Sequence, residues 1–436
     1  MGIPVAGRRA GGRTMTMAMT EAASAHTLDR VARRQTLITS WLLIGLAVFV
    51  AVVFGLQVEG SATFRLSLPR DTIQVPNLVV PAAPFIYIVA GILAFFGARQ
   101  FMRGGARWSS ILLGIGLLLV VAAFLVWAAD GKSFSLTGML ESTVVRAVPI
   151  ALGGLAGVLS ERVAVVNIGI EGMLLSGAFT GAVVGSLFGG VIGIVGAMLV
   201  GGLFGFILGA LVITYRVDQI IAGVAINLFV LGMTSYVSSQ VLTEYRDLNN
   251  APVFRSWPIP ILSDIPVLGP VLFQQNVFVY GAFVMVMIAT YYLFHTRSGL
   301  RARAVGEHPA AADTLGIDVY KVRYINVTIA GMVAGFGGAW FTLGSVGRFD
   351  EGMTGGRGFI GLAAMIFGRW HPVGALRAAL VFGFADSLQQ KLAILQTPIP
   401  SEFLAMAPYI ATIILVAGLI GRARAPAADG KPYIKE

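Results

Sequence analysis

Long, nearly uninterrupted apolar runs are the feature that most limits what this chain can fold into. A helix of about 20 apolar residues crosses the hydrocarbon core of a bilayer. Charged residues make up only 12% of the chain, against about 25% in a typical soluble domain. The runs are continuous rather than alternating, which argues against a membrane β-barrel. We therefore predict an all-α, polytopic integral membrane protein with about ten to twelve transmembrane helices. The apolar runs lie at 39–58, 78–98, 108–129, 143–160, 167–190, 191–215, 219–241, 276–295, 324–344, 372–394 and 404–421, with a shorter one at 359–368.

The positions of the basic residues predict how the chain is oriented. With the N-terminus in the cytoplasm, the segments on the inside carry 18 Lys and Arg residues, and those on the outside carry 7. This excess is the positive-inside bias of membrane proteins. The net charge of +10 is therefore topological, and we predict membrane lipid as a partner and no nucleic acid. Both termini are expected in the cytoplasm, and Glu161 and Arg162 are expected to be solvated at a cytoplasmic turn.

Composition divides the chain into four parts. Residues 1–38, rich in Gly, Ala, Thr and Arg, are interpreted as a cytoplasmic tail with little to bury. Residues 39–139 hold three spans with few internal polar groups and are expected to be peripheral. From 140 to 421 glycine is dense and polar residues enter the spans, so this part is the expected working core. Residues 422–436 are interpreted as a second cytoplasmic tail.

Glycines in the core are spaced for helix packing. Gly201, Gly205 and Gly209 recur every four residues in one span, and Gly331 and Gly335 do so in another. This spacing places glycines on one helix face and lets two backbones approach closely.

Two glycine-rich stretches interrupt apolar segments far apart in the chain, "NIGIEG" at 167–172 and "GGRGFIG" at 355–361. Paired interruptions in the two halves of a membrane protein are typical of repeats that meet near the bilayer midplane. We predict broken or re-entrant segments here and an inverted repeat in the core.

Five polar residues in the core are candidates to line a path through the membrane. Asn167 and Glu171 lie one turn apart, which would place both on one side of a helix. Glu171 is interpreted as binding the N–H groups of a broken helix at "NIGIEG" itself, with substrate contact as the alternative. Asn227 is in the middle of a span, where a helix–helix hydrogen bond and a path-lining position are both open. Arg357 is expected to hold a re-entrant turn, and Asp386 lies in a late span.

The inside loop at 296–323 has the pattern of a capped short helix. Pro309 suits a first helical turn, Gly316 suits a left-handed helix end, and Asp318 can cap the next helix. A docking helix for a partner fits this pattern. A helix held at the membrane surface by Arg301 and Arg303 is the alternative.

The longest outside loop, 242–275, contains Trp257 and five prolines. Repeated proline keeps a segment out of helices. A docking surface and a plain connection are both open.

The usual catalytic and metal-binding sets are not found in the sequence. It has no HExxH motif and no cysteine, and its four histidines are scattered among tails and span ends. We therefore expect no metal site, no catalytic residues and no enzyme activity in this chain.

Four segments, in order, resemble one family closely. They are "ERVAVVNIGIEGMLLSGAF" (161–179), "QIIAGVAINLFVLGMTSYV" (219–237), "LRARAVGEHPAAADTLGIDVYKVRY" (300–324) and "GGRGFIGLAAMIFGRWHPVGAL" (355–376). The family is the permease subunit of bacterial ABC importers of the simple-sugar and nucleoside type. It lies within the wider group of ribose and branched-chain amino acid permeases, and the resemblance covers 140–421.

The resemblance implies a transporter with several subunits in the bacterial inner membrane. Two permeases, identical or homologous, would form the channel, with ABC ATPase subunits inside and a substrate-binding protein outside. The loop at 300–317 would be the coupling helix that fits a groove on the ATPase. No cofactor is expected in this chain, because ATP and Mg would bind to the ATPase. The solute would be a nucleoside or a simple sugar. The positions that match the family's coupling motif are Gly306, Glu307, Pro309, Ala311, Ala312, Asp313 and Gly316.

The coupling motif departs from the family pattern at two positions. The loop usually reads GENPxAA, and here it reads GEHPAAA, with His308 for asparagine and Ala310 for a longer polar residue. The chain also lacks a phosphate-binding loop. The phosphate-binding loop has the pattern GxxxxGK[ST], and "GKS" at 131–133 matches only its end. The first glycine of the pattern would fall at residue 126, which is a valine, Val126. Energy therefore has to come from a separate subunit.

The alternative function is an ion-coupled secondary transporter. Such a protein needs a carboxylate or cation site inside the membrane to use an ion gradient. Glu171 and Asp386 are the candidates for that site.

Overall fold

The computed structural model describes residues 33–34, 36–103, 106–395, 403, 406 and 424–435. Most of the predicted N-terminal tail and nearly all of the predicted span at 404–421 lie outside these residues. The chain divides into two compact units, Met1–Arg65 with Pro76–Phe134, and Leu66–Val75 with Ser135–Glu436. Each unit is described by itself.

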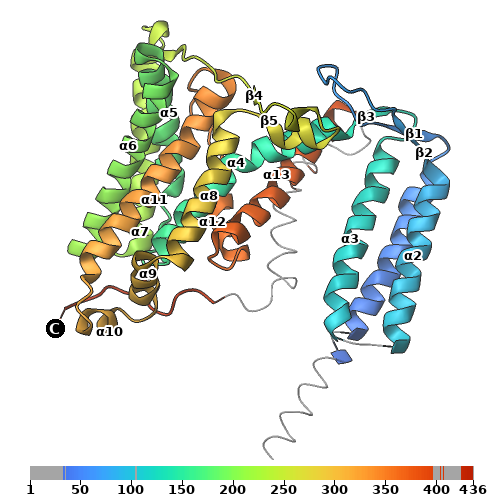
Figure 1. The fold of residues 1–436 in the computed structure, drawn as a ribbon, viewed down its shortest axis with the longest axis horizontal. Coiled ribbons are helices and arrows are strands. Elements are labelled where there is room, and N and C mark those ends of the chain that lie inside the picture. Colours follow the sequence, from blue (N-terminus) through green and yellow to red (C-terminus); the bar gives the residue numbers. More distant parts are fainter. Residues whose placement is uncertain are drawn as a thin grey trace, which may run out of the picture. The chain divides into compact units, whose positions relative to one another are not determined.

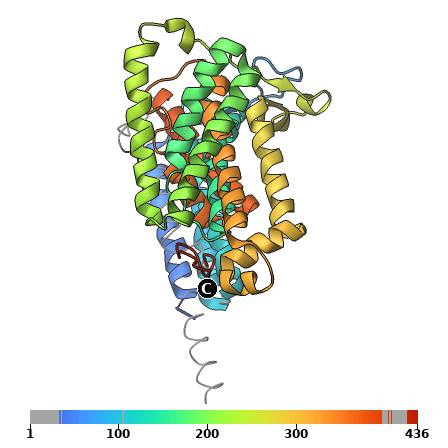
Figure 2. The same ribbon diagram turned by 90° about the vertical axis from the view of Figure 1, so that its left-hand side faces the viewer.

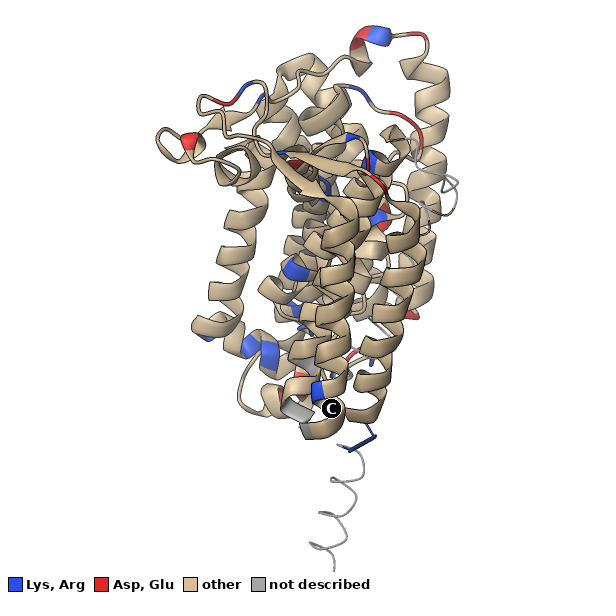
Figure 3. Ribbon diagram, turned by 90° about the vertical axis from the view of Figure 1, so that its right-hand side faces the viewer, with Lys and Arg blue, Asp and Glu red and all other residues tan. Residues whose placement is uncertain are grey.

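Helices long and apolar enough to cross a membrane dominate the described residues, and there are nine of them (Figure 1). This confirms the predicted all-α, polytopic architecture, while the inverted repeat stays a prediction. Charged residues are sparse along most of these helices (Figure 3). The nine spans are Thr36–Gln57, Ala82–Met102, Ile111–Ala128, Leu136–Glu161, Ile170–Phe188, Gly190–Thr214, Gln219–Leu242, Val277–His295 and Val319–Val346.

The first unit contains three spans and a small sheet. The span Thr36–Gln57 is followed by α2 (Ala82–Arg103) and α3 (Ala106–Ala128). The sheet has the strand order β2-β1-β3, formed by Leu78–Pro81, Ser61–Arg65 and Ser133–Ser135. β1 and β2 pair antiparallel, with Ser61 opposite Pro81. The Asp130 carboxylate fixes the start of β1 by accepting from the backbone N–H of Glu59 and Gly60 at 3.3 and 3.1 Å.

The second unit is built around α4 (Leu136–Glu161) and α11 (Val319–Phe341). In these two spans 83% and 78% of the most apolar window is buried, against 28% for α7 (Gln219–Val237). Neighbouring helices therefore cover most of α4 and α11, whereas α7 leaves most of its apolar surface free for lipid. The remaining helices are α5 (Ile170–Phe188), α6 (Gly190–Gly209), α8 (Val277–His295), α9 (Arg297–Glu307), α10 (Pro309–Thr314), α12 (Arg357–Phe367) and α13 (Pro372–Ile394).

The glycines of α6 and α11 face one another, as their spacing predicts. A Cβ placed on Gly201 would lie 2.3 Å from the carbonyl oxygen of Gly331. A Cβ on Gly335 would lie 2.1 Å from the carbonyl oxygen of Ala197, and one on Gly177 of α5 would lie 2.4 Å from that of Gly335. Three helix backbones thus approach so closely around Gly335 that no side chain fits.

We expect Gly335→Val to destabilise the protein strongly. The valine would meet backbone atoms, which cannot move without separating α11 from α6, and overpacking costs about 1–3 kcal/mol or more. The midpoint of thermal unfolding in detergent should fall by roughly 5–10 °C. Gly232→Val is the matched control, because nothing lies within 4 Å of a Cβ at Gly232. Equal midpoints for the two variants would contradict this packing.

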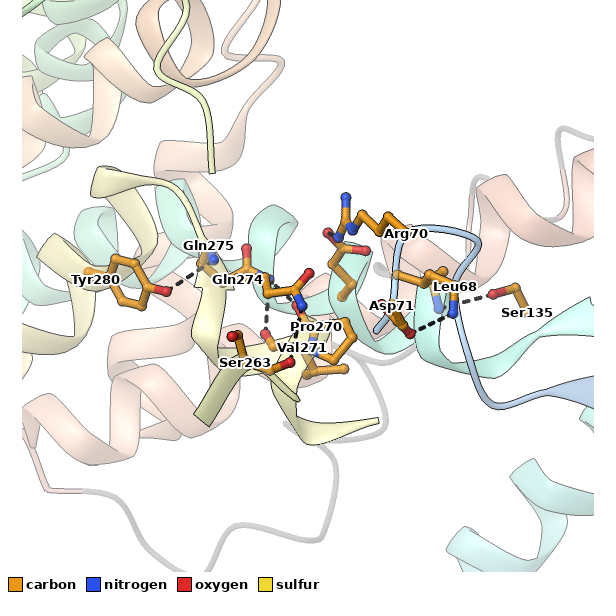
Figure 4. Close-up of polar contacts among 12 residues, drawn as sticks. Leu68, Arg70, Asp71, Ser135, Ser263, Pro270, Val271, Gln274, Gln275 and Tyr280 are labelled. Carbon is orange, nitrogen blue, oxygen red and sulfur yellow. Dashed lines mark hydrogen bonds and ion pairs between the residues drawn. The ribbon is translucent and has the colours of Figure 1, made fainter. Parts of the chain in front are cut away.

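The loop at 242–275, which is predicted to lie outside, is folded (Figure 4). β4 (Trp257–Pro258) pairs antiparallel with β5 (Gln274–Gln275). The side-chain amide of Gln275 donates to the carbonyl oxygens of Pro270 and Val271 at 2.8 and 3.0 Å, and Gln275 is only 2% exposed. Internal hydrogen bonds therefore hold the loop, while the side chain of Trp257 stays exposed. Docking of a partner on the loop stays a prediction.

Candidate functional site: a polar core and the loop at 296–323

The two glycine-rich stretches meet inside the second unit, through the Glu171 carboxylate. Glu171 lies in the first turn of α5 and accepts from the backbone N–H of Gly356 at 2.8 Å and of Gly358 at 2.6 Å. The Thr354 hydroxyl donates to the same carboxylate at 2.6 Å. The first N–H groups of a helix have no partner within the helix, so Glu171 caps α12 from a different helix. The predicted type of partner is correct, but these N–H groups belong to "GGRGFIG" and not to "NIGIEG".

Asn227 of α7 fixes the turn that leads into α5. Its side-chain amide donates to the carbonyl oxygen of Ile168 at 2.9 Å and accepts from the backbone N–H of Gly172 at 2.8 Å. Both hydrogen bonds join α7 to this turn. Of the two interpretations of Asn227 from the sequence, a helix–helix hydrogen bond and a path-lining position, the structure contains the first.

Asn167 does not share a helix face with Glu171, which corrects the prediction from their spacing. The helix begins only at Ile170, because the chain turns through Gly169 first. The Asn167 side chain is fully buried and contacts the sulfur of Met173 at 3.7 Å.

Arg357 and Asp386 form an ion pair between α12 and α13. The guanidinium lies 3.4 Å from the Asp386 carboxylate and donates to the carbonyl oxygen of Thr354 at 3.3 Å. The guanidinium also lies over the ring of Phe341, 5.7 Å from its centre. Arg357 therefore holds the turn before α12, as predicted, and its charge has a carboxylate partner.

A cavity of about 570 Å³ opens beside this ion pair. Its volume is within the range of roughly 300–1,000 Å³ for small-molecule sites. Glu141 pairs with Arg70 and Asp350 with Arg348, while the Arg146 guanidinium donates to the side-chain oxygen of Gln390. Hydroxyl groups and aromatic residues make up part of the remaining wall, which suits a polar solute without a net charge. The cavity is lined by Glu141, Ser142, Val145, Arg146, Trp340, Phe341, Ser345, Val346, Asp350, Met353 and Arg357.

The loop at 296–323 folds into two capped helices, α9 and α10, rather than one. Pro309 is at the start of α10, Gly316 has a left-handed φ of +79°, and the Asp318 carboxylate accepts from the backbone N–H of Lys321 at 3.0 Å. These three signals act as predicted. His308 accepts from the backbone N–H of Ala311 through Nδ1 at 3.4 Å. The imidazole thus takes the capping role of the asparagine that is common at this position.

The residues of the coupling motif divide between surface and interior. Glu307, Ala311 and Gly316 are exposed, and the Glu307 carboxylate accepts from the backbone N–H of Ala427 at 3.2 Å. The other four are less open: Gly306 and Ala312 are buried, Pro309 is half-buried, and half-buried Asp313 pairs with Lys435 at 3.3 Å.

Leu315 is an exposed residue that the sequence reasoning missed. Its side chain is 81% exposed at the end of α10. The signal that could have found it is an apolar residue placed directly before the helix-ending Gly316.

The end of α9 rests on the turn that follows α4. A Cβ on Gly306 would lie 2.2 Å from the carbonyl oxygen of Arg162. Arg162 in turn donates through Nε to the carbonyl oxygen of Trp370 at 2.8 Å, and the Trp370 indole donates to the Glu161 carboxylate at 2.5 Å. Glu161 is only 5% exposed, so the expectation that it is solvated is wrong, whereas Arg162 is half-buried. The Trp370 indole, 209 residues away in the chain, covers Glu161.

The turn that contains Trp370 is strained and joins α12 to α13. Arg369 and Trp370 have left-handed φ angles of +56° and +52°, which cost free energy for residues other than glycine. His371 follows and accepts from the backbone N–H of Val373 at 3.2 Å through Nδ1. Burial, with the nearby Arg162 and Arg377 guanidinium groups, lowers the pKa of His371. The imidazole is therefore neutral at pH 7 and can accept this bond.

Among the residues that the structure describes, no group of three or more His, Asp or Glu side chains is placed to hold a metal ion. Glu171 and Asn227 instead bind backbone atoms, and Arg357 pairs with Asp386.

Comparison with known proteins identifies the family. Residues 139–420 match the model of the branched-chain amino acid transport system permease component. The chain is 44% identical over 307 residues to the guanosine ABC transporter permease protein NupQ of Bacillus subtilis, which covers 68% of this chain and 96% of that protein. It is 39% identical over 312 residues to the nucleoside ABC transporter permease protein NupC of Lactococcus lactis, covering 68% and 96%.

A second permease of Bacillus subtilis, the guanosine ABC transporter permease protein NupP, is 29% identical over 297 residues, covering 63% of this chain and 82% of that protein. No solved structure matches the chain. The family match covers more than half of the chain, and the four sequence blocks and the fold agree with it. The chain therefore belongs to the branched-chain amino acid transport system permease family, and it is of that family's simple-sugar and nucleoside ABC importer type.

Proposed function

We propose that this chain is the permease subunit of an inner-membrane ABC importer that moves a nucleoside into the cytoplasm. A binding protein outside delivers the solute, and ATPase subunits inside bind the surface formed by α9 and α10. A simple sugar is the second solute class. Both termini lie in the cytoplasm, on the side of α9 and α10, in keeping with the excess of Lys and Arg on that side.

The close contact between the end of α9 and the α4 turn carries this proposal. Gly306 leaves no room for a side chain against Arg162, so a push on α9 has to displace the end of α4. Arg162 and Glu161 are bonded to Trp370 between α12 and α13. The cavity is lined by α4, α11 and the start of α12. An ATPase that moves α9 and α10 would thereby change the walls of the cavity.

A nucleoside is favoured by the relatives and by the cavity. NupQ and NupC are named as permeases for guanosine and for nucleosides. The cavity of about 570 Å³ combines aromatic walls with hydroxyl groups and paired charges, and a nucleoside is an uncharged molecule with a flat ring and hydroxyl groups.

A second, related permease is the proposed partner in the membrane. NupQ and NupP come from the same organism, and both are named as guanosine transporter permeases. This chain resembles NupQ more than NupP, which supports pairing with a homologous chain rather than with an identical one.

Ion coupling is disfavoured by the partners of the two candidate carboxylates. Glu171 already accepts three hydrogen bonds, and Asp386 is paired with Arg357. Neither carboxylate is left open to bind a transported ion.

We expect solute uptake to depend on ATP and not on an ion gradient. The complete transporter, with its binding protein and ATPase, should be reconstituted in vesicles and given radiolabelled guanosine. Accumulation should require hydrolysable ATP and should be unchanged by ionophores that collapse proton and sodium gradients. Vesicles with this chain alone are the control and should only equilibrate the solute. Accumulation driven by a gradient without ATP would overturn the proposal.

A further inference from the structure

The C-terminal segment Arg424–Lys435 lies against α9 and α10, which we call the coupling helices (Figures 1 and 2). We call this segment the C-terminal clasp. The family match ends at residue 420, so the clasp lies beyond the matched residues.

One end of the clasp is bonded to the end of α9. The backbone N–H of Ala428 donates to the carbonyl oxygen of Gly306 at 3.0 Å. The backbone N–H of Ala427 donates to the Glu307 carboxylate at 3.2 Å. The Ala428 side chain is only 6% exposed, so this part of the clasp is buried against its neighbours rather than lying loosely on them.

The other end of the clasp is bonded to the start of α11 and to α10. Tyr433 and Tyr320 have ring centres 5.7 Å apart, and the Tyr320 hydroxyl donates to the carbonyl oxygen of Tyr433 at 3.3 Å. Arg323, which is 2% exposed, donates to the carbonyl oxygen of Lys431 at 3.4 Å. The Lys435 ammonium pairs with Asp313 of α10 at 3.3 Å.

Gly430 brings the middle of the clasp to the turn that follows α4, because a Cβ placed on it would lie 3.6 Å from the Val166 side chain. Burial raises the pKa of the neighbouring Asp429 to about 6, and the nearby Glu161 carboxyl partly offsets this rise. Glu161 is the residue that binds the Trp370 indole. One segment of twelve residues therefore touches the coupling helices, α11 and the α4 turn.

We propose that the C-terminal clasp fastens the coupling helices to the cytoplasmic ends of α4 and α11, so that these elements move as one body when the ATPase acts. Gly306 pushes on the α4 turn only by contact, and contact does not transmit a pull. The clasp supplies the connection in the opposite direction, because it is bonded to α9, α10 and α11 and packs against the turn that follows α4. Its role in transport rests on the proposed function, whereas its docking does not.

Labelling of single cysteines tests the docking directly, because the chain has no cysteine of its own. Ala428→Cys places a thiol at a buried position of the clasp, and Ala425→Cys places one at an exposed position three residues earlier. In the purified, complete transporter, N-ethylmaleimide should react at least tenfold more slowly at residue 428 than at residue 425. Equal rates would show that the clasp is not docked and would overturn the proposal.

The same two variants test the role of the clasp after folding is complete. The labelled transporter is reconstituted and its ATP-dependent guanosine uptake is measured, and the wild-type chain treated with reagent reports effects on the partner subunits. Complete labelling at residue 428 should force the clasp off and lower uptake at least tenfold, while labelling at residue 425 should leave uptake within twofold. Full uptake after complete labelling at residue 428 would overturn the proposal.

A pair of substitutions provides an independent check. Tyr433→Ala removes the ring contact with Tyr320, and Ile434→Ala changes an exposed neighbour. At equal abundance in the membrane, Tyr433→Ala should reduce uptake severalfold and Ile434→Ala should not. If wild-type uptake proves independent of ATP, the proposed function fails, and the labelling rates at residues 428 and 425 still decide whether the clasp docks.

Discussion

Replacing Glu171 with glutamine is expected to lower transport at least tenfold and to reduce thermal stability. The carboxylate accepts from Thr354, Gly356 and Gly358, with two donors on one oxygen and one on the other. A glutamine side chain has one oxygen and one NH₂ group. Its NH₂ group would therefore face either the Gly358 N–H or the two donors on the other side. Leaving a buried donor without a partner costs about 1–3 kcal/mol.

For Glu171→Gln, both solute uptake and the midpoint of thermal unfolding of the purified protein should be measured. A role in holding α12 predicts that both fall together, and that nucleosides of different ring type are affected alike. A direct contact with the solute predicts instead a raised KM with an unchanged midpoint. Glu351→Gln is the control, because Glu351 is exposed in the same loop region. An unchanged midpoint for Glu171→Gln would show that the capping bonds do not hold the core.

Replacing Gly306 with valine is expected to abolish transport while the chain still inserts in the membrane. The valine Cβ would fall 2.2 Å from the Arg162 carbonyl oxygen, so the end of α9 would be forced away from the α4 turn. The cytoplasmic ends of α4, α12 and α13 would lose their link to the coupling helices. We expect ATP hydrolysis to continue without stimulation by the loaded binding protein, and uptake to fall by at least about 100-fold, equivalent to about 2.7 kcal/mol.

The test of Gly306→Val measures uptake and ATP hydrolysis in the same reconstituted vesicles. Gly232→Val is again the matched control, since the same side chain is added where nothing lies within 4 Å. Undiminished uptake by Gly306→Val would mean that the α9 contact with Arg162 does not transmit motion.

The coupling loop shows how far local sequence signals reach. Pro309, Gly316 and Asp318 predicted helix boundaries that the structure contains. Each signal depends on atoms within about one turn of the residue itself, so a reading along the chain is enough to find it. The additional helix, α9, was missed although it carries a local signal of the same kind, since the Thr296 hydroxyl accepts from the backbone N–H of Gly299 at 3.0 Å.

The polar core shows where local signals end. Glu171 was predicted to bind N–H groups of a broken helix, and it does, but its partner Gly356 is 185 residues away in the chain. The same limit explains the error at Glu161, whose solvation was inferred from its place at a turn. Nothing near it in sequence shows that the Trp370 indole covers it.

The sequence by itself determined that this chain crosses a membrane as helices, which glycine faces pack, and where the short helix α10 begins and ends. Those properties follow from hydrophobicity and capping, which act over a few neighbouring residues. The tertiary structure alone decided that Glu171 caps α12, that Glu161 and Arg162 bind the Trp370 turn, and that the C-terminal clasp lies on the coupling helices. These contacts join segments separated by 100 residues or more. They depend on how helices pack in three dimensions, and a pattern read along one dimension does not contain that information.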